Sequence, residues 1–109
     1  QELTNTYGAT IPSVTGSNAT PSSWAVGCAA SLTGCFGYHT TDSFLNSGNQ
    51  VRFGAEDSYA AFDTTPQEVM YSSVPTNESY DIVYKIQVGQ DQPAGEYQKN
   101  ITYIAVPVF

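Results

Sequence analysis

Two cysteines and the chain's one histidine lie close together in the sequence, and they are the side chains best suited to specific chemistry. Six residues separate Cys28 from Cys35, and His39 follows shortly after. Two thiolates and an imidazole could bind zinc, but a structural zinc site needs four ligands, and no convincing fourth is present. An isolated cysteine pair in a secreted chain instead favours a disulfide that closes a short ring. We therefore predict a Cys28–Cys35 disulfide, with no metal and no cofactor.

His39 is also the only candidate for a catalytic base. Asp42 and Ser43 lie nearby, as a serine hydrolase would require. However, neighbours along an extended strand point in divergent directions, and no nucleophile elbow surrounds the serine. A solitary surface histidine explains His39 better, so we predict no catalytic residue and no enzymatic activity.

Acidic and amide side chains gather on the predicted loops. A carboxylate pair for glycoside hydrolysis could come from Glu56, Asp57, Asp63 and Glu68. Oxygen ligands for calcium could come from Asp42, Asn46, Asn49, Glu56 and Asp57. A solvated acidic loop explains the first set, and the second lacks the twelve-residue calcium-loop pattern. We predict neither site.

The composition indicates an extracellular module. The 109 residues are enough for one domain with a modest core. Charged residues make up only 12%, about half the usual share, and ten acidic residues against three basic ones give a net charge of −7. Such a chain cannot neutralise phosphates, so nucleic acid and anionic membranes are poor partners. It begins at Gln1, as after removal of a signal peptide, and no apolar run is long enough for a membrane span.

The segment from Ser79 to Phe109 carries the clearest strand pattern. Residues 80, 82, 84, 86 and 88 are apolar or aromatic and alternate with a more polar row, which predicts a strand with one buried face. A second strand is predicted from Glu96 to Phe109. The connection Gly89–Gly95 is too long for a two-residue hairpin, so we expect the two strands to lie in different sheets.

This ending carries a resemblance to known proteins. The run from Gln92 to Tyr97, followed by residues 100–103 and a terminal aromatic, resembles the closing strands of secreted bacterial β-sandwich surface modules. Residues 34–42 are also similar to one group of such modules. The family includes pilin-like and spore-coat-type subunits and C-terminal modules of surface proteins. The resemblance implies a structural or binding role outside the cell.

The rest of the chain supplies further strands. Strands are predicted at 24–28, 36–42, 50–53 and 67–72, with a turn at 46–49 and a helical turn or compact loop at 55–62. Trp24 is expected in the core. We predict an all-β fold, a single immunoglobulin-like or pilin-like β-sandwich of seven to nine strands formed by residues 24–109.

An N-terminal strand and a linker precede the sandwich. Residues 1–11 alternate as a strand laid over a core, and residues 12–23 are rich in Ser, Thr, Asn and Pro, as in a linker or a long surface loop. The anchoring row for pairing with a neighbouring subunit is Leu3, Tyr7, Ala9 and Ile11. The same strand could instead fold back onto its own sheet.

Two sequons on predicted loops are candidates for glycosylation. They begin at Asn18 and Asn77, whereas a third, at Asn100, falls within a predicted strand.

Two functions follow. In the first, the chain is a non-enzymatic extracellular subunit that assembles with copies of itself into a surface filament or layer, by donating its N-terminal strand. In the second, it is a self-contained binding module from the end of a larger secreted surface protein. Stacked tyrosines with Trp24 could then bind a glycan. The packing of Leu3, Tyr7 and Ile11, within their own subunit or not, distinguishes the two.

Overall fold

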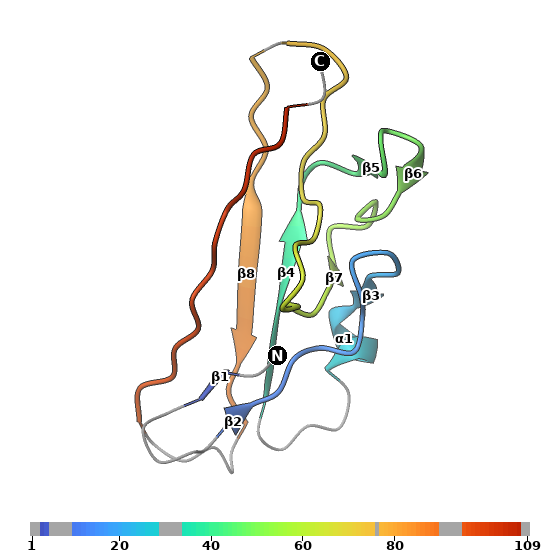
Figure 1. Cartoon of the computed structure of the whole chain (residues 1–109). Coiled ribbons are helices and arrows are strands. Elements are labelled where there is room, and N and C mark those ends of the chain that lie inside the picture. Colours follow the sequence, from blue (N-terminus) through green and yellow to red (C-terminus); the bar gives the residue numbers. More distant parts are fainter. Residues whose placement is uncertain (1–2, 5–9, 29–33, 76, 90–94, 108–109) are drawn as a thin grey trace.

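The computed structural model describes residues 3–4, 10–28, 34–75, 77–89 and 95–107 (Figure 1). The elements, in chain order, are β1 (Leu3–Thr4), β2 (Thr10–Ile11), β3 (Ser22–Ser23), α1 (Trp24–Gly27), β4 (Cys35–Thr40), β5 (Phe44–Leu45), β6 (Gln50–Val51), β7 (Ser58–Tyr59) and β8 (Ile82–Gln87). The regular structure is therefore mostly strand with almost no helix, in agreement with the all-β prediction. The strands pair only two by two, so the sandwich of seven to nine strands stays a prediction.

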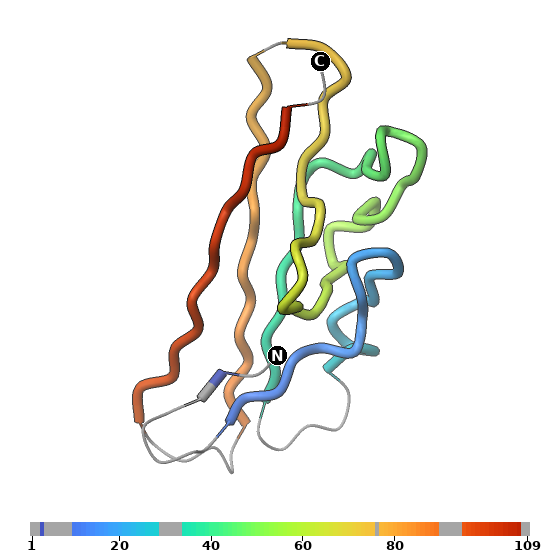
Figure 2. The backbone as a smooth tube through the Cα atoms, viewed as in Figure 1, coloured from blue at the N-terminus to red at the C-terminus, as the bar shows by residue number. Residues whose placement is uncertain are grey.

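The antiparallel pair β4–β8 is the longest ladder, and its register places Tyr38 opposite Tyr84. β4 is buried at every residue. Its second edge is occupied too: Val14 N donates to Phe36 O at 2.9 Å, and Tyr38 and Ala60 exchange two backbone hydrogen bonds. β4 is therefore the central strand. β8 pairs with β4 alone among the strands of the described chain, and residues 95–107 run along its far side in the view of Figures 1 and 2.

Three small apolar clusters surround β4. They are Val14, Trp24, Cys28, Cys35 and Tyr59; Tyr38, Leu45, Phe53 and Ala60; and Leu3, Ile11 and Phe36. Phe62 joins two of them, because its ring stacks on Phe36 with centroids 5.5 Å apart and also lies 5.0 Å from Tyr38. Gly37 permits the close approach of neighbouring chain, since a Cβ there would lie 2.8 Å from a Val14 methyl.

Residues 24–28 begin as a short helix, and the strand prediction there is wrong. Ser23 is its N-cap, with Oγ accepting a hydrogen bond from Val26 N at 3.3 Å. Cys28 N then donates to Trp24 O at 2.8 Å. The turn places Trp24 and Cys28 in one buried cluster and leaves Val26 exposed, so the local cap overrides the alternating pattern.

Residues 12–23, predicted as a linker or a long surface loop, pack against the rest of the domain. Val14 is buried in the first cluster, and Ser22–Ser23 forms strand β3, which pairs with β7. The composition of this segment did not reveal that it is packed, because the packing depends on two side chains, Val14 and Asn18, which are both buried.

The N-terminal residues form a hairpin. β1 pairs antiparallel with β2, placing Leu3 opposite Ile11, so residues 2–11 are not one extended strand. Leu3 and Ile11 are both buried against Phe36 of the same chain.

The turn predicted at residues 46–49 is confirmed. It connects β5 to β6, whose register places Leu45 opposite Gln50. Asn46, Ser47 and Gly48 all have positive φ, between 55° and 79°, a region that Asn and Gly adopt more readily than other residues.

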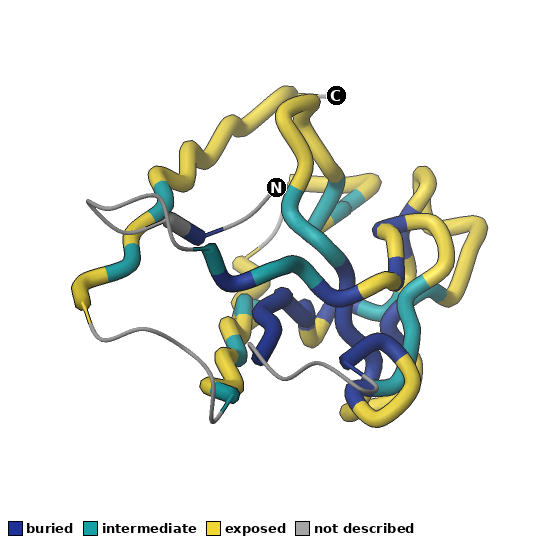
Figure 3. Tube along the Cα trace, turned by 90° about the horizontal axis from the view of Figure 1, so that it is seen from below, coloured by how far each residue is buried: buried dark blue, intermediate teal, exposed yellow. Residues whose placement is uncertain are grey.

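Three further segments differ from their predictions. Residues 58–59 form β7 in place of a helical turn. Residues 67–72 form no strand because side chains bind their backbone: Thr40 Oγ1 donates to Val69 O at 2.7 Å, and Asp42 Oδ2 accepts from Tyr71 N at 2.9 Å. Residues 99–107 also form no strand. Figure 3 shows this last segment in a different layer from β8 and mostly exposed.

Candidate functional site

The outer edge of β8 presents backbone groups that no described residue pairs. Neighbouring residues in an antiparallel strand direct their N–H and C=O groups to opposite edges. Phe36 and Tyr38 direct theirs away from β8, so the alternate residues of β4, which are Cys35, Gly37 and His39, bond to β8. Their partners on β8 have odd numbers, since Lys85 lies opposite Gly37. Ile82, Tyr84 and Ile86 therefore direct their backbone groups outward, where no backbone hydrogen bond from the described chain meets them.

The side chains on this strand are unusually apolar for their exposure. Ile86 is 57% and Val88 66% exposed, and Val83 and Tyr84 are also exposed. The sequence predicted a buried row at 80–88, and that expectation is wrong beyond Ile82, which is half-buried against the second cluster. The physical reason is that, within the described part of the chain, no second layer buries Ile86 or Val88.

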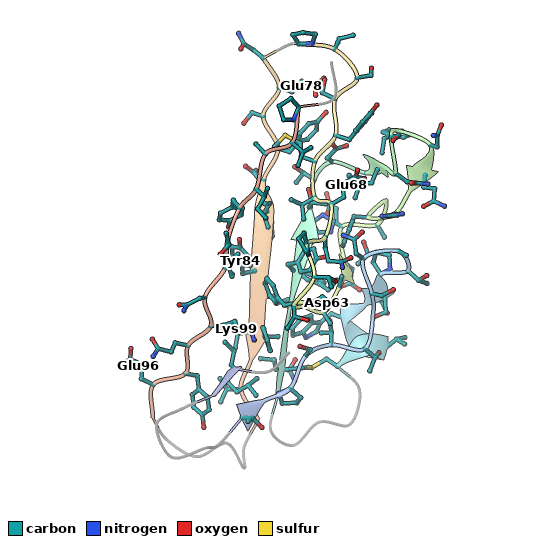
Figure 4. All side chains as sticks on the ribbon, in the orientation of Figure 1. Asp63, Glu68, Glu78, Tyr84, Glu96 and Lys99 are labelled. Carbon is teal, nitrogen blue, oxygen red and sulfur yellow. A yellow bond between two sulfur atoms is a disulfide. The ribbon has the colours of Figure 1, made fainter. Side chains whose placement is uncertain are left out.

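The C-terminal segment adds a second exposed apolar stretch. Tyr103 and Val106 are 64% and 73% exposed, and Ile101 and Ile104 are exposed as well. Tyr84 extends from β8 toward this segment, and its hydroxyl group contacts that of Tyr103 (Figure 4). We call β8 with Val88 and residues 101–106 the open apolar surface.

The opposite face of β8 is closed by aromatic rings. Lys85 Nζ lies 4.7 Å from the ring centroid of Trp24 and 5.4 Å from that of Tyr59. Trp24 Nε1 donates to Gln87 Oε1 at 2.9 Å. Trp24 is therefore a core residue, as predicted, and is covered by β8. The sequence analysis missed this Lys85 arrangement, because only the pairing of β4 with β8 brings residues 24, 59 and 85 together.

The predicted disulfide between Cys28 and Cys35 is confirmed. The two Cα atoms are 5.9 Å apart, within the ordinary range, and both cysteines are buried in the first cluster. The bond joins the end of α1 to the beginning of β4.

The predicted donor residues fall into two groups. Leu3 and Ile11 are buried in their own chain, whereas Tyr7 and Ala9 lie outside the described residues.

The two predicted glycosylation sites have opposite surroundings. Asn77 is exposed, as expected. Asn18 also lies on a loop, but this loop is packed into the domain and Asn18 is only 5% exposed. Its amide nitrogen donates to Tyr38 Oη at 3.0 Å and to Glu68 O at 2.7 Å, and its oxygen accepts from Arg52 at 2.7 Å. This amide links three other segments of the chain, and a glycan attached to it would break these hydrogen bonds.

Burial also changes the pKa of Tyr38. Removal of its phenol from water raises the pKa of Tyr38 above 10, against the smaller opposing effect of the Asn18 hydrogen bond.

His39 is buried, so its expected surface position is wrong. Its Nδ1 lies 2.8 Å from Ser58 O, and its ring packs against Phe53 and Tyr59. Asp42 is buried too, where it accepts hydrogen bonds from Phe44 N and Tyr71 N. Both side chains therefore bind backbone groups of other segments and have structural roles.

The acidic side chains do not gather. Figure 4 shows Asp63, Glu68, Glu78 and Glu96 spread along the molecule. Among the residues that the structure describes, no three His, Cys, Asp or Glu side chains are grouped to hold a metal ion. The same described residues contain no helix long and apolar enough to cross a bilayer.

The open apolar surface is thus the candidate functional site of the described chain. Comparison of the sequence and fold with protein-family models, curated proteins and solved structures finds no match.

Proposed function

We propose that this chain is a non-enzymatic structural subunit of the cell exterior that assembles with copies of itself. One observation carries the proposal: the outer edge of β8 has backbone groups that no residue of the described chain pairs, beside exposed apolar side chains. Exposed, flat, apolar strand edges are templates for pairing with another chain, and soluble monomers usually protect them with charge, proline or a covering loop. The disulfide and the charge-poor composition support an extracellular location.

Assembly would also complete the fold. Residues 101–106 and β8 each expose apolar side chains in separate layers, as two incomplete sheets of a sandwich would. Strands from a neighbouring copy would bury both rows and give the immunoglobulin-like or pilin-like sandwich that the alternating sequence predicts.

Strand donation by residues 2–11 is the less favoured route to assembly. Leu3 and Ile11 already fill the cluster around Phe36, so donation would have to empty that cluster in every subunit. We infer that the N-terminal hairpin stabilises its own domain and that the neighbouring copies meet elsewhere.

Sedimentation velocity tests the proposal across a concentration series. The parent chain should form dimers or larger species. Ile86→Lys, which places a charge in the open apolar surface, should weaken this association. Val26→Lys is the matched control, because Val26 is 68% exposed on α1, away from that surface, and the variant should assemble as the parent does. A parent chain that stays monomeric at high concentration would reject the proposal.

A self-contained module of a larger secreted protein is the second candidate. The burial of Leu3 and Ile11 within their own chain favours it. A glycan site built on Trp24 is disfavoured, because Lys85 and β8 cover that ring. Deletion of residues 1–11 distinguishes strand donation from a self-contained module. If the segment is donated, the shortened chain stays folded but monomeric; if it belongs to its own core, the chain loses stability.

A further inference from the structure

We propose that β8 pairs antiparallel with β8 of a second copy, in the register that places Val83 opposite Val83 across a two-fold axis. Asp81 of each copy then lies opposite Lys85 of the other. This inference rests on the proposed self-assembly and specifies its contact.

The ladder pattern limits the registers. The outward backbone groups belong to Ile82, Tyr84 and Ile86, so an even-numbered residue must lie opposite an even-numbered residue of the second copy. A two-fold register is therefore centred on a single residue of β8, and we compare centres at 82, 83, 84 and 85.

Charge selects one of these registers. A centre at Val83 places Asp81 opposite Lys85 twice, once on each side of the axis. A centre at Lys85 would place two ammonium groups opposite each other, which is unfavourable. Centres at Ile82 or Tyr84 leave both charges opposite uncharged residues. Val83 is the only centre of the four that pairs every charge between residues 81 and 87.

Both charged residues are already held in strand geometry. Asp81 precedes β8, yet its carbonyl accepts from Thr41 N at 3.0 Å and its N–H donates to Thr41 Oγ1 at 2.7 Å. Asp81 is exposed to solvent. Lys85 lies over Trp24 and Tyr59, on the face of β8 that it shares with residue 81, so Asp81 of the second copy would meet it on that face.

The other face of the pairing is apolar. In the same register Ile82 lies opposite Tyr84 of the second copy, and Ile86 opposite its Tyr80. Cross-strand pairs of aromatic and β-branched side chains stabilise antiparallel sheets. A two-fold contact of this kind closes a dimer, so growth into a layer or filament requires a second contact, for which residues 101–106 are exposed.

Charge variants test the register by sedimentation velocity. Asp81→Lys alone and Lys85→Asp alone each place like charges opposite one another and should weaken self-association by at least about tenfold. An equimolar mixture of the two variants should associate again, because each residue then meets an opposite charge in the mixed dimer. Lys85→Asp also loses its aromatic contacts, so circular dichroism must show that it remains folded.

Cross-linking tests the same register without changing a charge. In a non-hydrogen-bonded pair the Cα atoms are about 4.5 Å apart, so Val83→Cys should form a disulfide between copies under mild oxidation. Val88→Cys is the matched control: its two copies would lie about 33 Å apart along the strand and should not cross-link through this dimer. Peptide mass spectrometry should locate the bond at position 83 of both chains, with Cys28–Cys35 intact.

The outcomes are separable. Cross-linking at position 83 with recovery in the charge mixture supports the pairing. A parent chain that associates, without cross-linking at 83 and without recovery in the mixture, overturns this register and leaves the proposed function standing. A monomeric parent chain without cross-linking at 83 overturns both.

Discussion

The ammonium group of Lys85 lies over the ring of Trp24, 4.7 Å from its centroid, although 61 positions separate the residues in the sequence (85 − 24). Tyr59 lines the same space, with its ring packed edge-on against Trp24 at 5.1 Å. The contact attaches the marginal strand β8 to the disulfide-bearing cluster. Cation–π contacts contribute about 0.5–2 kcal/mol, more when they are shielded from water.

We expect Lys85→Met to lower the free energy of unfolding by about 0.5–2 kcal/mol, because methionine keeps most of the apolar stem but loses the charge. A double-mutant cycle with Trp24→Leu isolates the pair, with urea unfolding as the measurement. The second substitution should cost less once the first is present. Strictly additive losses would contradict the contact.

The disulfide should contribute about 2.5 kcal/mol by restricting the unfolded chain, as expected for a ring of about eight residues. Cys28→Ser with Cys35→Ser should lower the urea midpoint accordingly. The fully reduced parent chain is the control, since it tests loss of the bond without a new side chain. An unchanged midpoint in both would show that the bond does not stabilise the fold.

Asn18→Ala should destabilise the chain by about 1–3 kcal/mol, because it leaves the buried Tyr38 hydroxyl and the Glu68 carbonyl without a donor. Asn77→Ala is the matched control at an exposed position and should change stability by less than about 0.5 kcal/mol. Equal effects of the two substitutions in thermal or urea unfolding would contradict the placement of Asn18.

Expression in a host that glycosylates sequons provides an independent readout. Folded, secreted protein should carry glycan at Asn77 and not at Asn18, as measured by intact-mass and peptide mass spectrometry. Fully folded protein with glycan at Asn18 would show that its amide does not hold the three segments together.

Stability should fall at alkaline pH through Tyr38. Its pKa is raised in the folded chain, mainly by desolvation, so the unfolded chain releases this proton first. The contribution is complete below about pH 10 and is lost as pH rises from there through the folded pKa. Urea midpoints from neutral to alkaline pH should therefore decline, and Tyr38→Phe should flatten the decline. An equally steep decline in the variant would assign it to other tyrosines.

The local sequence pattern was sufficient to predict those features that depend only on residues close together in the sequence. The alternation at 82–87, the Asn-Ser-Gly turn at 46–48 and the short Cys28–Cys35 ring all act over a few residues, and each forms as predicted. The low charge and the strand-rich character follow in the same way from composition.

Tertiary structure decided the features that depend on distant partners. Alternation shows which residues share a face, but not whether another layer covers that face. In the row at 80–88, Ile82 is half-buried whereas Ile86 and Val88 are exposed. Asn18 is buried because Tyr38, Arg52 and Glu68 converge on its amide from three other segments. Residues 67–72 form no strand because side chains from β4 and the turn after it bind their backbone. Burial and hydrogen-bond partners are properties of the folded neighbourhood, and the order of residues alone does not specify them.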